Sequence, residues 1–299
     1  MRLDHLITQL TTEFRVTEFQ EAWPQFGLAN VGIASFASPQ FLAHGNGLMV
    51  QGQPDVTEVY TAVFPSMTVL DQVLARALPG SLLVCHHPLR YDGIQGYLSL
   101  SRLDLTRLRD RGLSVYALHA PLAFGERVST WRALARKLGV EVEGTFRSSN
   151  NKLGCYGIPR VPDDQQDVFT FKSMVLRVES ELEINNSQVI EHVDRAVGRV
   201  ALVPGDGADP ELVALADELG CHTYITGILD NPIFDQVVRA RSQAFLDHAR
   251  VRALNLIGAS QYATEAPGLR VLTTWFQALG LTAQFIPDKP ELPEFLKGW

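Results

Sequence analysis

The spacing of apolar residues predicts alternating helices and strands along most of the 299-residue chain. Apolar positions three and four residues apart indicate amphipathic helices, and short apolar runs indicate strands buried on both faces. In the first half, this pattern predicts helices over residues 2–19, 66–78, 100–111 and 130–138, and strands over residues 56–64, 81–85 and 113–118. Between residues 23 and 54, repeated glycines break the pattern, so only short strands and loops are expected there.

The same alternation returns after a polar, acidic middle stretch, in which residues 168–178 have a β-like pattern. It predicts strands over residues 199–203, 222–226 and 254–257, and helices over residues 209–219, 232–252 and 267–279. A succession of strand, helix and strand is typical of parallel α/β folds. We therefore predict an α/β protein whose two similar αβ halves face a central cleft. The predicted N-terminal half spans residues 1–140, a connecting segment spans 141–198, and the C-terminal half spans 199–299, together forming one compact two-lobed unit.

Composition narrows the classes of protein that fit. Hydrophobic residues make up 46% of the chain and charged residues 20%, as in ordinary globular proteins. No apolar run approaches the roughly 20 residues of a membrane span. Only three cysteines occur, with no CxxC pair, which favours a reducing, cytoplasmic setting. The net charge of −7 argues against a general nucleic-acid binder.

Histidines follow two neighbouring strands of the predicted sheet. His86 and His87 end the strand over residues 81–85, and His119 comes directly after the strand over residues 113–118. Ligands of open α/β sheets bind at such carboxyl ends of strands, and imidazole is a common metal ligand. The two adjacent imidazoles could splay towards two separate ions, or could be structural. His119 could instead shape its turn by donating to a backbone carbonyl.

Three further segments allow more than one interpretation. Thr264 and Glu265 could simply begin the last long helix, whose N-terminus favours acids, or Glu265 could act as a metal ligand or general base. The Gly205–Gly207 loop has the form of a small anion-binding nest, but a tight turn between a strand and a helix is favoured. Cys85 lies in an apolar strand, where a buried structural thiol is favoured over a nucleophile.

Four segments in this order resemble the NIF-three-like proteins, dinuclear-metal-centre hexamers often labelled GTP cyclohydrolase I type 2 homologues. The segments are LLVCHHPL (82–89), SVYALHAPL (114–122), VPGDGA with TYITG (203–208 and 223–227), and NLIGASQYATE (255–265). The resemblance covers roughly residues 56–140 and 200–285. It implies the family's fold and a toroidal homohexamer built from dimers, with the metal sites facing an inner cavity.

The resemblance implies a set of metal ligands that this chain keeps only in part. Three of five principal ligand positions are kept: His86, His87 and Glu265. The family's metal-binding aspartate falls on Ala123, and one of its histidine ligands falls on Gln261. His119 matches a histidine that lines the site without being a principal ligand, and it would transfer protons there.

These replacements lower the number of ions expected. Two cations about 3.5–4 Å apart repel each other, and a bridging carboxylate usually offsets this repulsion. Alanine supplies no charge, and a neutral amide is a poor ligand for zinc or iron. We expect at most one divalent transition metal per chain (Zn, Fe or Mn), or none, unless Asp92 or Glu126 supplies a compensating ligand.

Two functions follow from this degenerate dinuclear site. In the first, the protein is a metal-binding, hydrolase-like enzyme in which His119 and Glu265 do the acid–base work. Its unidentified substrate would be small and either phosphorylated or heterocyclic. In the second, the chain is a catalytically inactive oligomeric scaffold or binding protein that has lost its metals.

Overall fold

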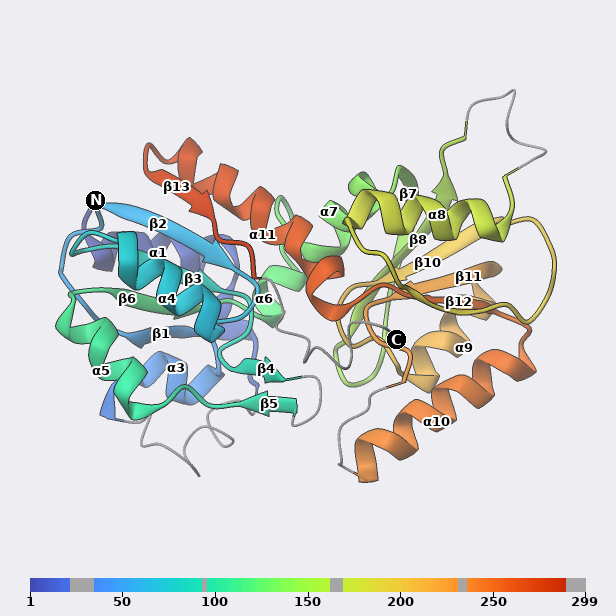
Figure 1. The fold of residues 1–299 in the computed structure, drawn as a ribbon, viewed down its shortest axis with the longest axis horizontal. Coiled ribbons are helices and arrows are strands. Elements are labelled where there is room, and N and C mark those ends of the chain that lie inside the picture. Colours follow the sequence, from blue (N-terminus) through green and yellow to red (C-terminus); the bar gives the residue numbers. More distant parts are fainter. Residues whose placement is uncertain (22–34, 93–95, 162–168, 231–235, 289–299) are drawn as a thin grey trace. The chain divides into compact units, whose positions relative to one another are not determined.

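The computed structural model describes residues 1–21, 35–92, 96–161, 169–230 and 236–288 (Figure 1). The chain divides into two compact units. The first unit comprises residues 1–129 and the described residues from 268 onward, and the second comprises residues 130–267. Each unit combines helices with a sheet that contains adjacent parallel strands, so the predicted α/β class is confirmed. Among the described helices, none has the length and apolar character needed to cross a bilayer.

The first unit is built on a five-stranded sheet with strand order β1-β6-β3-β2-β13. Its strands are β1 (Gly47–Val50), β2 (Glu58–Ala62), β3 (Leu82–Cys85), β6 (Ser114–Ala117) and β13 (Thr282–Phe285). Strands β6, β3, β2 and β13 pair in parallel, and β1 joins β6 antiparallel. A separate hairpin consists of β4 (Arg90–Asp92) and β5 (Gly96–Leu98).

Helices cover both faces of this sheet. They are α1 (Leu3–Glu13), the short η1 (Val16–Glu18), α3 (Pro39–His44), α4 (Met67–Arg76), α5 (Arg102–Asp110), α6 (Ala120–Ala123) and the C-terminal part of α11 (Gln261–Ala278). Side chains of α4 and α5 pack with Tyr60 and Leu83 in one core cluster. On the other face, the Thr61 hydroxyl donates to the Leu269 carbonyl of α11 at 3.0 Å. Both faces of β2 and β3 are therefore buried, which explains their uninterrupted apolar sequences.

The second unit is built on a six-stranded sheet with strand order β7-β8-β10-β11-β12-β9. Its strands are β7 (Val140–Arg147), β8 (Leu153–Pro159), β9 (Gln188–Ile190), β10 (Arg199–Val203), β11 (Cys221–Thr226) and β12 (Asn255–Gly258). Strands β10, β11 and β12 are parallel, and β8 and β9 flank them antiparallel. Residues 141–198, expected to connect the two halves, contribute β8, β9 and most of β7 to this sheet.

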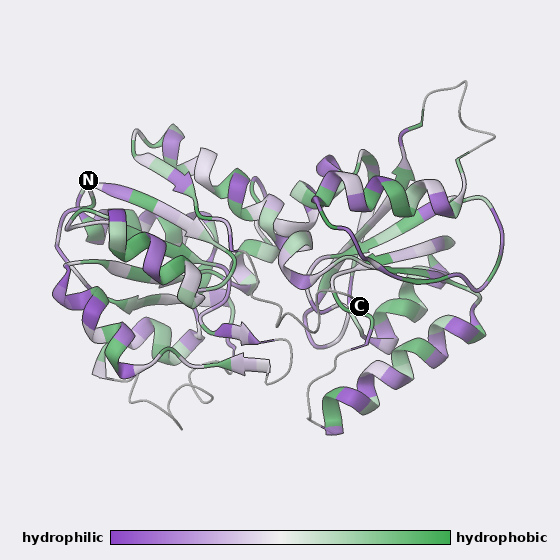
Figure 2. Cartoon of the chain, in the orientation of Figure 1, coloured by the Kyte–Doolittle hydropathy of each residue, from purple (hydrophilic) through white to green (hydrophobic). Residues whose placement is uncertain are grey.

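Two pairs of helices enclose the second sheet. Helices α7 (Thr130–Lys137) and α8 (Phe171–Leu182) pack in one core cluster, and α9 (Pro210–Glu218) and α10 (Gln236–Val251) pack in another. Figure 2 shows hydrophilic and hydrophobic residues alternating along α10, as expected of a helix with one buried face. The predicted start of this helix at residue 232 lies outside the described residues.

Three predicted elements were wrong. Residues 39–44, expected to lie among short strands and loops, form α3, because Ser38 caps its start and Gly45 ends it in the left-handed region. The β-like stretch over residues 168–178 is occupied by α8, in which Phe171, Met174 and Val178 are buried at helical spacing and Thr170 forms a capping box. The last long helix begins at residue 261 rather than at Pro267, because α11 includes this proline. Proline is favoured in the first turn of a helix, so Pro267 predicts a start there, but in α11 it lies inside the helix at the cost of one backbone hydrogen bond. As a result, the QYATE segment is helical.

Candidate metal centre

Three histidines lie at the carboxyl ends of two adjacent parallel strands. His86 and His87 follow β3, and His119 comes two residues after β6. The backbone N–H groups of His86 and His87 donate to the carbonyls of Ala62 and Val63, at 3.0 and 2.9 Å. These bonds continue the hydrogen-bond pattern between β2 and β3, so the sheet fixes the backbone positions of His86 and His87.

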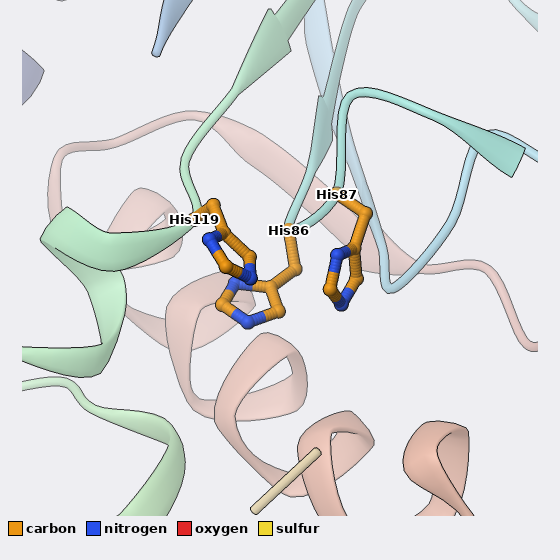
Figure 3. Close-up of side chains that lie close together, drawn as sticks. All are labelled: His86, His87 and His119. Atoms are coloured by element: carbon orange, nitrogen blue, oxygen red, sulfur yellow. The ribbon is translucent and has the colours of Figure 1, made fainter. Parts of the chain in front are cut away.

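The three imidazoles gather around one position (Figure 3). One ligand nitrogen from each of His86, His87 and His119 lies within 4.8 Å of the other two. The ring centroids are 4.6–4.7 Å apart, and the rings of the adjacent residues meet nearly edge to face, at 76°. Adjacent histidines could have faced two separate ions, but the structure brings both to the same group as His119.

A backbone carbonyl fixes the tautomer of His86. Its Nδ1 lies 3.0 Å from the carbonyl oxygen of Leu118. A carbonyl can only accept, so Nδ1 carries the proton and donates it to this bond. The lone pair of the neutral ring is then on Nε2. Such a hydrogen bond on the far side of the ring is typical of metal-ligating histidines.

A buried carboxylate likewise binds Nδ1 of His119 and fixes the tautomer of the neutral ring. Glu21 Oε1 lies 2.6 Å from His119 Nδ1, and Glu21 Oε2 accepts from Asn46 Nδ2 at 2.8 Å and from the Ala120 N–H at 3.1 Å. Burial acts to raise the pKa of Glu21, but the charge and the hydrogen bonds of these partners outweigh it and lower the pKa to about 2. Glu21 is therefore an ionised carboxylate beside the histidine group. The sequence analysis missed it, since no motif relates it to a residue 98 positions away.

Aromatic side chains surround His87. Phe64 stacks on its ring with centroids 4.5 Å apart, and Tyr97 of β5 lies at 5.5 Å. Tyr91 of β4 in turn stacks on Phe64. Burial, together with the charge of His119, holds the pKa of His87 well below its usual range. The ring is neutral at pH 7, and this is the form that binds a metal.

Comparison with known sequences decides the family. The sequence model of Duf34/NIF3 (NGG1p interacting factor 3) matches residues 38–286. The chain belongs to the DUF34/NIF3 family. The resemblance inferred from four short segments is thus confirmed over most of the chain.

Relatives of this DUF34/NIF3 protein match over similar lengths. The GTP cyclohydrolase 1 type 2 homolog of Pseudomonas aeruginosa is 25% identical over 232 residues, which are 76% of this chain and 81% of that protein. The solved structure of protein ybgI, of unknown function, has a TM-score of 0.71 at 20% identity and covers 97% of this chain and 100% of its own. The protein TTHA1606 from Thermus thermophilus has a TM-score of 0.64 at 22% identity, covering 98% and 100%. At these identities, the two structures show the fold alone.

The other predicted residues of the first unit lie outside the three-histidine group. Ala123 ends the short helix α6, one turn after His119. The side chain of Glu126 is 82% exposed and faces Arg15 at 3.7 Å, while Asp92 is half-buried in β4. Cys85 is buried and burial raises the pKa of its thiol, as expected of a structural cysteine.

In the second unit of this DUF34/NIF3 chain, Gln261 and Glu265 are both buried in the first turns of α11. The Glu265 carboxylate lies against Gly205, whose φ of +77° and lack of a side chain allow this close approach. The amides of Gly205 and Gly207 donate to the hydroxyls of Thr264 and Thr226, each at 3.0 Å. The glycine loop therefore uses these amides internally, as a tight turn does. The role of Glu265 as a ligand or base stays a prediction.

Proposed function

We propose that this DUF34/NIF3 protein binds one divalent transition metal per chain through His86, His87 and His119, and uses it for hydrolase-like chemistry. The observation that supports the proposal is the grouping of three ligand nitrogens within 4.8 Å. In a tetrahedral site with Zn–N bonds of about 2.0–2.1 Å, the nitrogens are roughly 3.3 Å apart. The difference is within the reach of small side-chain rotations.

The donor set fits zinc or iron better than manganese. Imidazole suits Zn and Fe, whereas carboxylate and water ligands suit Mn. Two of the three rings have Nδ1 bonded to an oxygen, of Leu118 for His86 and of Glu21 for His119, so Nε2 is the nitrogen oriented for a metal. Three histidines with an open fourth position are a known ligand set of catalytic zinc.

A bound metal would supply Lewis acidity, which activates water or polarises an oxygen of the substrate. The chain's own residues would prepare the site. The aromatic side chains around His87 exclude water from that side, and the protonated Nδ1 of His86 fixes the plane of its ring. In this proposal His119 is a ligand rather than a proton carrier, and Glu265 is left as the candidate acid or base. The substrate is unknown.

The second candidate function is a catalytically inactive scaffold or binding protein. It is favoured by Ala123 and Gln261, which replace two ligands of the family resemblance. Under either function, we propose a cytoplasmic homo-oligomer. The resemblance to the hexameric members supports six chains in a toroid.

Titration of the metal-free protein with Co²⁺ tests the proposed site. The wild type should bind one ion per chain with the visible absorption of a site of low coordination number. His87→Ala should lower the affinity by about 100-fold or more, because it removes one of three ligands. His5→Ala, which removes an exposed histidine from the same unit, should bind like the wild type. A wild type that binds no Co²⁺ or Zn²⁺ would contradict the metal proposal and favour the scaffold.

Restoring the two replaced ligands should create a second metal position. Ala123→Asp combined with Gln261→His should raise the metal content from one to two ions per chain, because the aspartate supplies the charge that offsets repulsion between two cations. Elemental analysis after removal of free metal would measure the stoichiometry. Ala123→Asn with Gln261→His is the matched control without the charge and should stay at one. No gain in the aspartate variant would show that the residue-by-residue correspondence is wrong.

A further inference from the structure

Glu21 is held from several sides at the position where it meets His119. Its backbone N–H donates to the His44 carbonyl at 3.0 Å, and its Oε2 accepts from Asn46 and from the Ala120 N–H. Asn46 is fully buried, and its Oδ1 accepts from the backbone N–H of His119 at 2.7 Å. Glu21 and Asn46 therefore both bind His119. Glu21 accepts from Nδ1 of its ring, and Asn46 accepts from its backbone N–H.

This network determines which nitrogen His119 can offer. The Glu21 carboxylate only accepts, so Nδ1 of the neutral ring must donate to it, and the lone pair is on Nε2. Both side chains are largely buried, with 18% of Glu21 and 25% of His119 exposed, so water competes little for this bond. A carboxylate bonded to the far side of an imidazole also makes the ring a stronger metal ligand.

The charge of Glu21 matters as much as its hydrogen bond. Three neutral imidazoles leave the two positive charges of a divalent ion uncompensated. The Glu21 carboxylate contacts the ring of His119 directly. Negative charge is thus present next to the three-histidine group.

We propose that Glu21 is the positioning residue that makes His119 a metal ligand, and that its carboxylate supplies, through the imidazole, the negative charge that three neutral imidazoles lack. This inference rests on the three-histidine site proposed above. It assigns to the N-terminal segment a role in binding a divalent transition metal such as Zn²⁺ or Co²⁺. Glu21 acts through His119 and does not itself bind the ion.

Zinc affinity measured by competition with a chromogenic chelator tests this role. Glu21→Ala should weaken Zn²⁺ binding by about 10–100-fold, the usual effect of losing a partner behind a ligating histidine. Glu21→Gln keeps an oxygen acceptor but loses the charge, so it should weaken binding less, and it serves if the alanine variant does not fold. Glu18→Gln, which changes an exposed acid three residues away, is the matched control and should bind like the wild type.

A double-mutant cycle distinguishes positioning from direct ligation. If Glu21 acts through His119, the Glu21→Ala/His119→Ala variant should bind Zn²⁺ no more weakly than His119→Ala alone. If the double variant is weaker by the full effect of Glu21→Ala, the carboxylate is a ligand and the positioning role is overturned. In ¹⁵N NMR spectra of the zinc-bound wild type, His119 should show a protonated Nδ1, and Glu21→Ala should lose this single tautomer.

The two proposals fail in different ways. If the wild type binds no zinc or cobalt, the proposed three-histidine site and the proposed role of Glu21 are both overturned. If the wild type binds zinc and His87→Ala weakens binding as expected, but Glu21→Ala and Glu21→Gln both bind like the wild type, only the role of Glu21 is overturned.

Discussion

His86→Ala is expected to abolish the stabilisation that zinc gives to the protein. A ligand that binds only the folded state at 100 times its Kd adds about 2.7 kcal/mol to the free energy of unfolding. Without the His86 imidazole, two of the three grouped nitrogens remain, and Zn²⁺ at the same concentration should add almost nothing. The variant should also lose about 1–3 kcal/mol in the absence of metal, since the Leu118 carbonyl loses its buried donor. Calorimetric unfolding with and without Zn²⁺ measures both effects.

His86→Gln separates these two losses. Its amide N–H can still donate towards the Leu118 carbonyl, so the metal-free protein should be closer to the wild type than His86→Ala. Its amide oxygen is a poor ligand for zinc, so the zinc-dependent stabilisation should still be lost. If either variant gained as much stability from Zn²⁺ as the wild type does, the metal would have to be bound elsewhere.

Local signals explain what the sequence alone could predict about the fold. The strand predicted over residues 199–203 is β10, a short apolar run between polar residues. The helix predicted over residues 66–78 is α4, whose start is capped by the Ser66 hydroxyl, which accepts from the Val69 N–H. In both cases the information lies within a few residues of the element. The predictions failed at α8, where a β-like and a helical apolar pattern overlap, and at α11, where Pro267 lies inside the helix.

Local sequence signals predict only part of the candidate site. The positions of His86, His87 and His119 at strand ends could be predicted, because each follows an apolar strand directly or closely. Their convergence could not, since it depends on the parallel register of β3 and β6. The contact of Glu21 with His119 depends on folding over 98 residues and follows no spacing rule. A carboxylate that acts through another side chain leaves no motif in a single sequence.

Phe245→Ala is expected to cause the largest loss of stability without affecting the metal site. The ring is fully buried in the second unit and packs edge to face on Tyr224, with centroids 5.6 Å apart. Truncating such a side chain removes its buried surface and leaves a cavity, at a cost of about 3–5 kcal/mol. Thermal unfolding of the metal-free variant, followed by calorimetry, should therefore begin at a clearly lower temperature. Val251→Ala, on the same helix α10 but 80% exposed, should change the stability by about 0.5 kcal/mol or less.

At temperatures where the Phe245→Ala variant is folded, its zinc affinity should stay within about twofold of the wild type. The reason is additivity, because the core around Phe245 and the three histidines belong to different compact units. A large loss of zinc binding in the folded variant would mean that the second unit is needed to hold the metal, and would implicate Glu265. Phe245→Ala should thus lose stability and keep zinc binding, whereas His86→Gln should lose zinc binding and keep most of the stability. Together the two variants separate the residues that hold the fold from those that hold the metal.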